Sequence, residues 1–458
     1  MEPIPEVERA HPARHVVERL RRAGHEAFWV GGCVRDLLLG RRPGDHDIAT
    51  SARPPMIEAL FERTVPVGRQ FGVVIVHLGD CRFEVATFRE EAGYRDGRRP
   101  DEVRFSNAIA DARRRDFTIN GLFLDPLTGQ VHDWVGGEAD LKDRIIRAIG
   151  SPADRFREDH LRMLRAVRFA AQLGFSIEPD TFRALVENRG WLSRISAERI
   201  RDELLKLFHP THAALGLTLL RETGLLAQLL PEIDALATCQ QSPDYHPEGN
   251  VLEHVRLMLS HLAEDAAPML TWAVLLHDIA KPLTASPPAA SGSIHFFGHE
   301  RVGAEMAREI LSRLRFPRRQ IDEVATMVRH HMQFKDVRNM RKATLRRMLM
   351  RKTFPLELEL HRLDCLGSHG RLDLHEFLVK EADDLRRQPQ VVPPLIDGKD
   401  LIALGMTPGR DLGRMLAEVR ERQLQDELTT PSQARDWVGN QLHRQGLDPS
   451  QAGVELGS

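Results

Sequence analysis

Cysteine is scarce in this chain of 458 residues, and it contains no long apolar run. The four cysteines are far apart and form no Cys-x-x-Cys pair: Cys33, Cys81, Cys239 and Cys365. That spacing excludes a disulfide framework and a thiolate zinc site, and it predicts a reducing compartment. Residues 1–20 lack an apolar run of the signal-peptide type, and the longest apolar runs, such as 272–276, are too short to span a bilayer. We therefore expect a soluble, cytoplasmic protein with no membrane contact.

Lysine is also rare, since 8 of the 64 basic residues are lysine and 56 are arginine. The planar arginine fork suits phosphates, so this bias is compatible with a nucleic-acid partner, although a GC-rich genome explains it equally well. The net charge of -2 excludes a uniformly basic DNA-coating protein but not a local basic surface. A content of 42% hydrophobic and 28% charged residues excludes a wholly disordered chain. The length indicates roughly three or four domains.

Strands and helices alternate over residues 25–150, whereas the chain from residue 154 onward has an almost entirely helical pattern. Four strands are predicted, at 27–30, 45–49, 73–78 and 82–88. Helices are predicted at 155–173, 197–208 and from Pro431. Three connecting segments are predicted: a mobile loop at 92–101, a loop at 286–293 and a linker at 391–394. The expected fold is an α/β head with a mixed sheet and flanking helices, followed by an all-α remainder.

A Gly31-Gly32 pair lies between a predicted strand and a predicted helix. Glycines let the backbone approach a phosphate, and the helix N-terminus presents free N–H groups to it. Arg35 lies one turn into this helix, where it could grip a triphosphate. A tight turn explains the same glycine pair without a ligand.

Three carboxylates follow. Asp45 and Asp47 share one face of a strand because side chains alternate, and Glu84 lies in an apolar strand further along. Two carboxylates on one face repel unless a cation separates them, and two Mg²⁺ ions about 4 Å apart are the usual reason in polymerases. A solvated strand edge is the alternative for this pair.

An arginine run at 113–115 precedes Asp116 and Asn120. Arginine clusters bind phosphates, and an Asp with an Asn can read ribose hydroxyls. A solvated basic turn is the alternative for this segment.

The helix predicted at 155–173 places Arg155, Asp159 and Arg162 on one face. An Asp accepts from the exocyclic amine of C or A, and an Arg donates to the neighbouring ring nitrogen, whereas U and G present the opposite polarity. One Asp/Arg pair could therefore select C and A without a template. A surface salt-bridge ladder is the alternative.

Taken in order, these motifs resemble the bacterial-type (class II) tRNA nucleotidyltransferase and poly(A) polymerase family. They are Gly31-Gly32-x-Val34-Arg35-Asp36, Asp45-x-Asp47, Glu84-Val85-Ala86-Thr87-Phe88-Arg89, Arg114-Arg115-Asp116-Phe117-Thr118-Ile119-Asn120 and Glu158-Asp159-x-x-Arg162. The resemblance covers at least residues 25–210, and five motifs together are far more specific than any single one. Residues 197–200 match a further helical motif of the family.

The resemblance implies transfer of a nucleotide to RNA by two Mg²⁺ ions. Asp45 and Asp47 would hold the metals, with Glu84 as the third carboxylate. The implied nucleotide-binding residues are Gly31, Gly32 and Arg35 for the triphosphate, Asp116 and Asn120 for the ribose, Asp159 and Arg162 for the base, and additionally Arg165 and Arg168. The 3′-hydroxyl of the RNA would attack the α-phosphate of CTP or ATP.

Three positions depart from the family pattern: His46 between the aspartates, His160 where proline is common, and Gly121 for a frequent alanine. None removes a ligand, but His46 is expected to alter the packing behind the metals. Residues 92–101 correspond to a flexible element that the family needs for the switch to A addition, which weighs against an enzyme that adds only CC.

Histidines gather over residues 246–335 in a pattern that resembles an HD-type metal-dependent phosphohydrolase domain. The matching residues are His254, His277, Asp278, His299 and His330, with His331 as the alternative to His330. Histidines and an aspartate that converge from several helices make a transition-metal site. A structural remnant without metal is the alternative.

The basic stretch at 341–347 and the Gly-rich turns at 395–410 indicate either solvated faces and caps or contact with tRNA. The domains expected are a nucleotidyltransferase head at 1–150, a base-recognising neck at 151–225, an HD-type domain at 226–345 and a helical tail at 346–458. The predicted activity is addition of C and A from CTP and ATP to the tRNA 3′ end.

The sequence does not separate CCA addition from A-only addition or poly(A) tailing. A hydrolase of RNA ends or nucleotides is the rival of another class. A non-enzymatic RNA-binding protein is disfavoured, because binding alone needs no carboxylate triad. The oligomeric state stays open.

Overall fold

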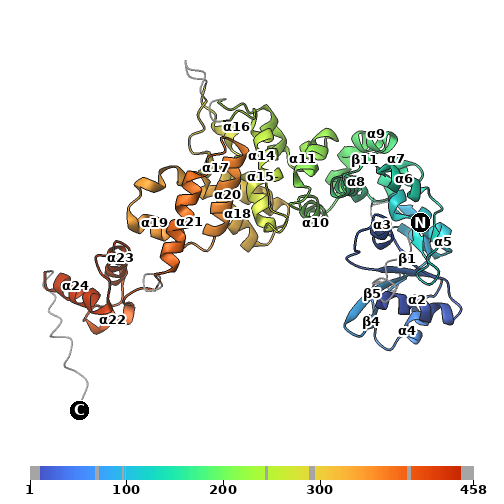
Figure 1. Ribbon diagram of the computed structural model, residues 1–458, viewed down its shortest axis with the longest axis horizontal. Helices are drawn as coiled ribbons and strands as arrows, with labels where there is room; N and C mark the ends of the chain where they lie inside the picture. The colour runs from blue at the N-terminus through green and yellow to red at the C-terminus, as the bar shows by residue number, and fades with distance from the viewer. Residues whose placement is uncertain are drawn as a thin grey trace, which may run out of the picture. The chain divides into compact units, whose positions relative to one another are not determined.

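The structure is a computed structural model that describes residues 11–67, 72–94, 97, 100–242, 246–287, 294–388 and 393–444 (Figure 1). The chain divides into two compact units. Unit 1 comprises Met1–Ala235, Ala263–Thr271 and Ile310–Pro317, and unit 2 comprises Leu236–Leu262, Trp272–Glu309 and Arg318–Ser458. None of the described helices combines the length and the hydrophobicity that a bilayer span requires.

Unit 1 contains a seven-stranded mixed sheet in the order β3-β4-β5-β2-β1-β8-β9. Its strands are β1 Ala27–Val30, β2 Asp47–Thr50, β3 Thr64–Pro66, β4 Val73–Leu78, β5 Cys81–Thr87, β8 Phe123–Leu124 and β9 Val131–His132. β1 runs antiparallel to β2, and β2 runs parallel to β5. This confirms the mixed-sheet head that the sequence predicts.

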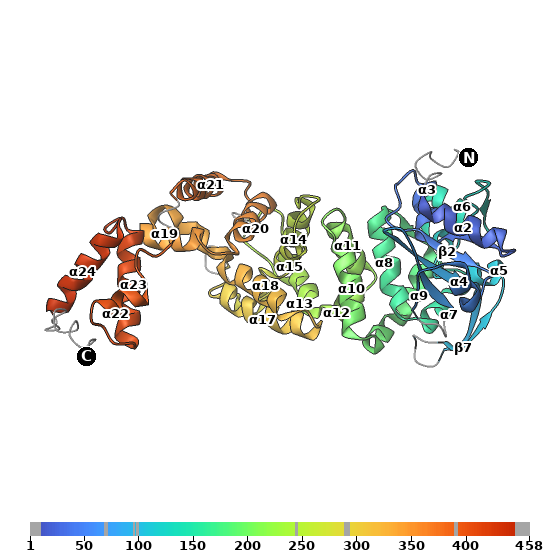
Figure 2. The same cartoon turned by 90° about the horizontal axis from the view of Figure 1, so that it is seen from below.

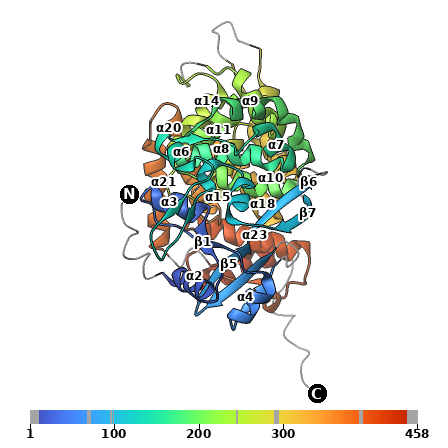
Figure 3. The same cartoon turned by 90° about the vertical axis from the view of Figure 1, so that its right-hand side faces the viewer.

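Helices cover both faces of this sheet, which explains why all four residues of β1 are buried. The helices α2 Pro12–Arg22 and α4 Pro54–Leu60 lie on one side of β1 and β5, and Figure 3 shows α8 on the other side. On the face opposite α2, Phe28 and Val30 of β1 pack with residues of α5 Ala108–Arg113. The site residues described below lie at the edge of this second face.

The remainder of unit 1 is almost entirely helical (Figure 2). Its elements are α3 Gly32–Leu38, η2 Thr118–Asn120, α6 Gly137–Asp143, α7 Pro152–Glu158, α8 Leu161–Leu173, α9 Pro179–Asn188, η3 Arg189–Arg194, α10 Ala197–Leu207, α11 Ala213–Glu222, α12 Leu225–Leu229 and α13 Pro231–Asp234. One short parallel pair, β10 Ile145–Ile146 with β11 Ser176–Ile177, interrupts this run. The expectation that strands end by residue 150 is therefore wrong for this pair.

Unit 2 is built from helices with a short 3-10 segment, as the sequence predicts. They are α14 Val251–Ser260, α16 Lys281–Thr284, α18 Arg318–His330, η5 His331–Asn339, α19 Lys342–Leu349, α20 Phe354–Gly367, α21 Asp373–Arg386, α22 Gly398–Ala403, α23 Arg410–Leu424 and α24 Pro431–Arg444. The chain leaves one unit and enters the other within α15 Pro268–Leu276 and α17 His299–Arg313, and also at η4 Ala235–Thr238.

Two sequence predictions about local structure are wrong. The loop predicted at 92–101 is wrong at both ends, where β6 Arg89–Tyr94 and β7 Pro100–Phe105 pair as an antiparallel hairpin. Instead of one helix, residues 155–173 form α7 and α8 with a break at Asp159 and His160. Parts of the predicted loops, namely 95–96, 98–99, 288–293 and 391–392, lie outside the described residues.

Candidate active site and metal centre

The three predicted carboxylates meet at one end of the central strands. Asp47 is the first residue of β2 and pairs with Val30, whose side chain faces α5. In the parallel pairing of β2 with β5, Ile48 lies opposite Val85, so Glu84 flanks Asp47 on the same face. Burial, Asp45 and Glu84 together raise the pKa of Asp47 to about 6. Three carboxylates therefore act on one another at this strand end.

His46 lies on the opposite face from these carboxylates. Its buried ring stacks on His11 at 4.0 Å between centroids and meets Trp29 edge-on at 4.6 Å. Asp45 and Asp47 are therefore the chain neighbours of a residue whose ring is buried among aromatic side chains. This agrees with a packing role for His46, which departs from the family pattern.

Gly31 forms the turn between β1 and α3. Its φ of +74° is left-handed, and a Cβ there would lie 3.0 Å from Nη1 of Arg115. Arg115 donates to Asp111 at 3.1 Å and to the carbonyl of Asn120 at 3.4 Å, and it also lowers the pKa of Asp47. In the sequence this arginine is one of a run of three with no feature that distinguishes it. Because Gly31 has no Cβ, the guanidinium of Arg115 has room next to the carboxylates.

Four of the predicted nucleotide-binding residues form one hydrogen-bonded chain. Arg35 donates to Asn120 at 2.9 Å, Asn120 donates to Asp116 at 3.0 Å, and Arg165 donates to Asp116 at 2.6 Å. Burial alone would raise the pKa of Asp116, but Arg165, Asn120 and Arg162 hold it well below its usual range. Asp116 is therefore ionised and fixed in place at neutral pH.

Asp159 and Arg162 do not lie on one continuous helix. Asp159 has extended backbone angles (φ −140°, ψ 106°) and ends α7, and α8 begins two residues later. Its carboxylate accepts from Arg199 at 2.8 Å, whereas Arg162 donates to Glu158 at 2.6 Å. The helical argument for a shared face is therefore wrong, and Arg199 is the direct partner of Asp159. The signal for Arg199 was the motif at 197–200, to which the sequence assigned no role.

Arg168 is placed differently from Arg165. It is buried and donates to the buried Glu203 at 2.7 Å. This pair joins α8 to α10. The guanidinium of Arg168 is therefore held by a partner inside the protein and does not face an open site.

A contact joins the β6–β7 hairpin to the break between α7 and α8. The backbone N–H of His160 donates to the carbonyl of Gly97 at 3.1 Å. A Cβ on Gly97 would lie 2.1 Å from Nε2 of His160, so only glycine fits against this ring. The buried ring itself bonds the carbonyl of Phe156 at 2.8 Å.

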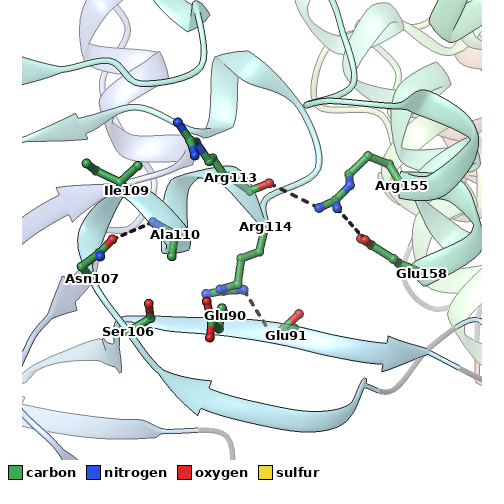
Figure 4. A pocket seen from close by; sticks show the side chains of 10 residues that line it. All are labelled: Glu90, Glu91, Ser106, Asn107, Ile109, Ala110, Arg113, Arg114, Arg155 and Glu158. Carbon is green, nitrogen blue, oxygen red and sulfur yellow. Dashed lines mark hydrogen bonds and ion pairs between the residues drawn. The ribbon is translucent and has the colours of Figure 1, made fainter.

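A pocket of about 430 Å³ opens nearby between β6, α5 and α7 (Figure 4). Its lining combines arginines with glutamates, including Arg114, Arg155 and Glu158. Arg155 donates to the carbonyl of Arg113 at 3.3 Å, and Arg162 donates to that of Arg114 at 3.1 Å. Arg113, Arg114, Arg155 and Glu158 of the predicted motifs line it, whereas the three carboxylates and the nucleotide-binding residues implied by the resemblance do not. The pocket lies beside the predicted site. The two hydrogen bonds connect the end of α5 to α7 and α8.

In unit 2, four of the predicted residues come together with His331. His277, His299 and His331 each donate Nδ1–H to the backbone carbonyl three residues earlier, at 2.9, 2.7 and 2.7 Å. Their Nε2 atoms then carry lone pairs and lie 3.1, 3.3 and 3.7 Å from Asp278. His254 joins His277 and Asp278 in a group whose ligand atoms all lie within 4.8 Å of one another.

His330 does not join this cluster. It ends α18 and faces Glu357 at 3.4 Å, whereas its neighbour His331 lies 3.1 Å from His299. The structure therefore places His331, the alternative, among the clustered histidines. It also adds Asp364, which lies 3.1 Å from Nε2 of His254 and which the sequence analysis missed.

The cluster has the chemistry of a transition-metal site. Nε2 of His277 is buried and has no hydrogen-bond partner among the described residues, yet it faces a carboxylate oxygen at 3.1 Å. A lone pair and a carboxylate repel at that distance, so either a proton on Nε2 or a metal ion lies between the two atoms. Despite burial, His277 and Lys281 hold the pKa of Asp278 well below its usual range, and burial together with His277 lowers that of His331 to about 3. Asp278 is therefore anionic and His331 neutral, which are the forms that bind a divalent ion of this class.

The basic stretch at 341–347 is largely neutralised within unit 2. Arg346 is buried and pairs with Asp426 at 2.5 Å, Lys342 pairs with the same carboxylate, and Arg347 pairs with Glu421 at 2.5 Å. These ion pairs connect the stretch to α23 and to Asp426 just after it. They favour the alternative in which the stretch has a structural role and does not contact tRNA.

Three family profiles match the chain. They are described as "Poly A polymerase head domain" for residues 27–147, "Probable RNA and SrmB- binding site of polymerase A" for 174–236, and "HD domain" for 249–387. The first two fall in unit 1 and cover the carboxylates and the residues after α8, and the third covers the histidine cluster.

Curated relatives match about half of the chain. A CCA-adding enzyme of Bacillus velezensis is 45% identical over 215 residues, which is 47% of this chain and 54% of that protein. One of Geobacillus stearothermophilus is 48% identical over 216 residues, which is 47% of this chain and 53% of that protein. The chain thus spans about half the length of the curated relatives it matches.

Solved structures match over a longer range. The CCA-adding enzyme of Bacillus stearothermophilus in complex with CTP has a TM-score of 0.71 at 28% identity, covering 95% of this chain and 98% of that one. The Thermotoga maritima CCA-adding enzyme complexed with tRNA has a TM-score of 0.56 at 22% identity, covering 96% and 99%, and shows the fold alone.

Proposed function

Because the chain belongs to the class II family of CCA-adding enzymes and poly(A) polymerases, in a form that carries an HD domain, we propose that it is a template-independent tRNA nucleotidyltransferase. It adds C and A from CTP and ATP to the tRNA 3′ end. The observation that carries this proposal is the crowding of Asp45, Asp47 and Glu84 at one strand end, which raises the pKa of Asp47.

These carboxylates fit Mg²⁺, which prefers oxygen ligands and would relieve their mutual repulsion. When bound, two such ions activate the attacking hydroxyl and stabilise charge on the triphosphate. The N-terminus of α3 after Gly31 offers N–H groups to the triphosphate, with Arg35 and Arg115 as nearby cations. Asp116, held by Arg165, keeps its charge to accept from ribose hydroxyls.

Base selection is assigned to Asp159 and Arg162. Arg199 orients the carboxylate of Asp159 with bonds of 3.0 and 2.8 Å, and the backbone of Leu161 donates to Oδ1 at 3.1 Å. A carboxylate offers about four lone-pair sites, so one on Oδ2 remains for the amine of C or A. Arg162 would exchange Glu158 for the ring nitrogen of the base.

Primer extension tests this proposal. tRNAs that end before CCA, after C and after CC are each incubated with Mg²⁺ and labelled CTP, ATP or both. Completion of CCA on the shortest tRNA supports the proposal. A-only addition to the CC end or long A tails would make the chain an A-adding enzyme or a poly(A) polymerase. No incorporation would refute the role of the head. Asp45→Ala should abolish addition while RNA binding is kept.

A second activity is proposed for unit 2, namely metal-dependent hydrolysis of phosphate esters at RNA ends or in nucleotides. The histidine–aspartate cluster around Asp278 favours it. A bound divalent transition-metal ion would supply Lewis acidity to a phosphate ester. Ring opening of cyclic phosphates to monoesters, or phosphate release from terminal phosphates, would support it if it is lost in His277→Ala but kept in Asp45→Ala.

A further inference from the structure

The ring of His254 is held differently from those of the other clustered histidines. His277, His299 and His331 each donate Nδ1–H to a backbone carbonyl three residues earlier. His254 lies inside α14, where the backbone carbonyls accept the hydrogen bonds of the helix itself. The acceptor for its Nδ1–H must therefore come from outside the helix.

Two groups outside the helix lie at this atom, the carboxylate of Glu248 and the carbonyl of Gly367, and Glu248 is the closer and the charged one. Its Oε1 lies 2.8 Å from Nδ1 of His254 and 2.8 Å from Nδ1 of His246. The side chain of His254 is fully buried and that of Glu248 is 5% exposed, so water does not compete for the bond. Gly249, at φ +113°, and Asn250, which caps α14 through the N–H of residue 253, turn the chain into the helix directly after Glu248.

A histidine that donates from Nδ1 offers Nε2 to a metal ion, which displaces any proton there on binding. For His254 this atom lies 3.1 Å from Asp364. His254 also belongs to a group with His277 and Asp278 whose ligand atoms lie within 4.8 Å of one another. The carbonyl of Gly367, at 3.3 Å from Nδ1, is the other acceptor, and it is neutral and more distant.

We propose that Glu248 is a positioning residue of this cluster: it fixes the tautomer and the orientation of His254 so that Nε2 is presented to a divalent transition-metal ion. The inference rests on the proposal that the cluster binds such an ion. A carboxylate behind a ligating histidine also increases the basicity of the ring. Loss of such a partner typically weakens metal binding about 10–100-fold, which is the effect expected for Glu248→Ala.

The test uses the full-length, metal-stripped protein titrated with Co²⁺ against a competing chelator. Glu248→Ala should bind Co²⁺ about 10–100-fold more weakly than the unchanged protein and alter its visible absorption bands. Glu248→Gln should recover most of the affinity, because the amide oxygen still accepts from Nδ1. Glu253→Ala is the matched control, since this glutamate of α14 is 38% exposed and pairs with Arg256. It should leave affinity and spectrum unchanged.

The outcomes separate the two proposals. If the unchanged protein binds no Co²⁺, the proposed metal site itself is refuted. If it binds Co²⁺ and Glu248→Ala binds equally well with the same spectrum, only the role of Glu248 is refuted. If Glu248→Ala fails to fold, as judged by circular dichroism, Glu248→Met replaces it, because methionine fills a similar volume without a strong acceptor.

Discussion

Asp116→Ala should destabilise unit 1 far more than removal of an exposed aspartate. Asp116 is buried and accepts two bonds from Arg165, at 2.8 and 2.6 Å, besides those from Asn120 and the N–H of Phe117. Breaking a buried ion pair costs about 3–5 kcal/mol. The side chain of Arg165 is 31% exposed, so water can solvate part of the freed guanidinium. We therefore expect the lower end, about 3 kcal/mol.

Thermal unfolding followed by circular dichroism measures this effect. For a unit of this size about 3 kcal/mol corresponds to a fall in melting temperature of about 6–12 °C. Asp154→Ala is the control, since Asp154 and Arg157 form an exposed pair with side chains 58% and 62% exposed, and it should cost less than about 1 kcal/mol.

The difference between the two variants should shrink as the pH falls. The folded pKa of Asp116 lies below its ordinary value of 3.8, so the stability it contributes is present above that value and is lost at lower pH. Equal melting temperatures for Asp116→Ala and Asp154→Ala at pH 7 would refute this reasoning.

Three further predictions follow from the two sites. Without divalent cations, unit 1 should lose stability as the pH rises through about 6, because the raised pKa of Asp47 favours the protonated folded state; melts at pH 5 to 8 should show this for the unchanged protein and not for Asp47→Asn. His331→Ala should lose bound transition metal by elemental analysis, whereas His330→Ala should retain it, because only His331 faces the cluster. Arg199→Ala should lower the preference for CTP and ATP over UTP and GTP by about tenfold or more in kcat/KM, because Asp159 loses its orienting partner; unchanged misincorporation would contradict this.

The head was predictable from the sequence where its signals are local. β1 and β4 have the predicted bounds, and Gly31 lies in the turn that its position between strand and helix indicates. Asp47 and Glu84 lie in short strands whose alternation fixes their face, whereas Asp45 precedes β2 and so lies outside the strand, which the sequence predicts at 45–49. The predicted division into four domains stays a prediction, as do the roles of the individual site residues.

The break at Asp159 was not predictable from a local pattern. Residues 155–173 have amphipathic spacing throughout, and the break is stabilised by distant groups. Asp159 bonds Arg199, and the N–H of His160 bonds Gly97. No window of helical length contains these partners.

The choice of His330 over His331 for the histidine cluster was wrong for a related reason. His330 and His331 are adjacent, and the residue at which α18 ends decides which of them faces Asp278. Asp364 and Glu248 are single acidic residues without a motif, and only the packing of α20 and the turn before α14 brings them to His254.

The bond between His160 and Gly97 has an evolutionary consequence. Proline at position 160 has no N–H to donate and no imidazole ring, although the φ of −58° at this residue and the extended Asp159 before it would both accept proline. A change to proline would therefore remove the clash with the imidazole ring at position 97, where the φ of +67° would still favour glycine or asparagine. The two positions should covary among homologues, with glycine retained at 97 where residue 160 keeps a donor and a bulky ring. Substitutions at either position are then expected to be epistatic, since Gly97→Ala clashes with His160 but has no such neighbour in the His160→Pro background.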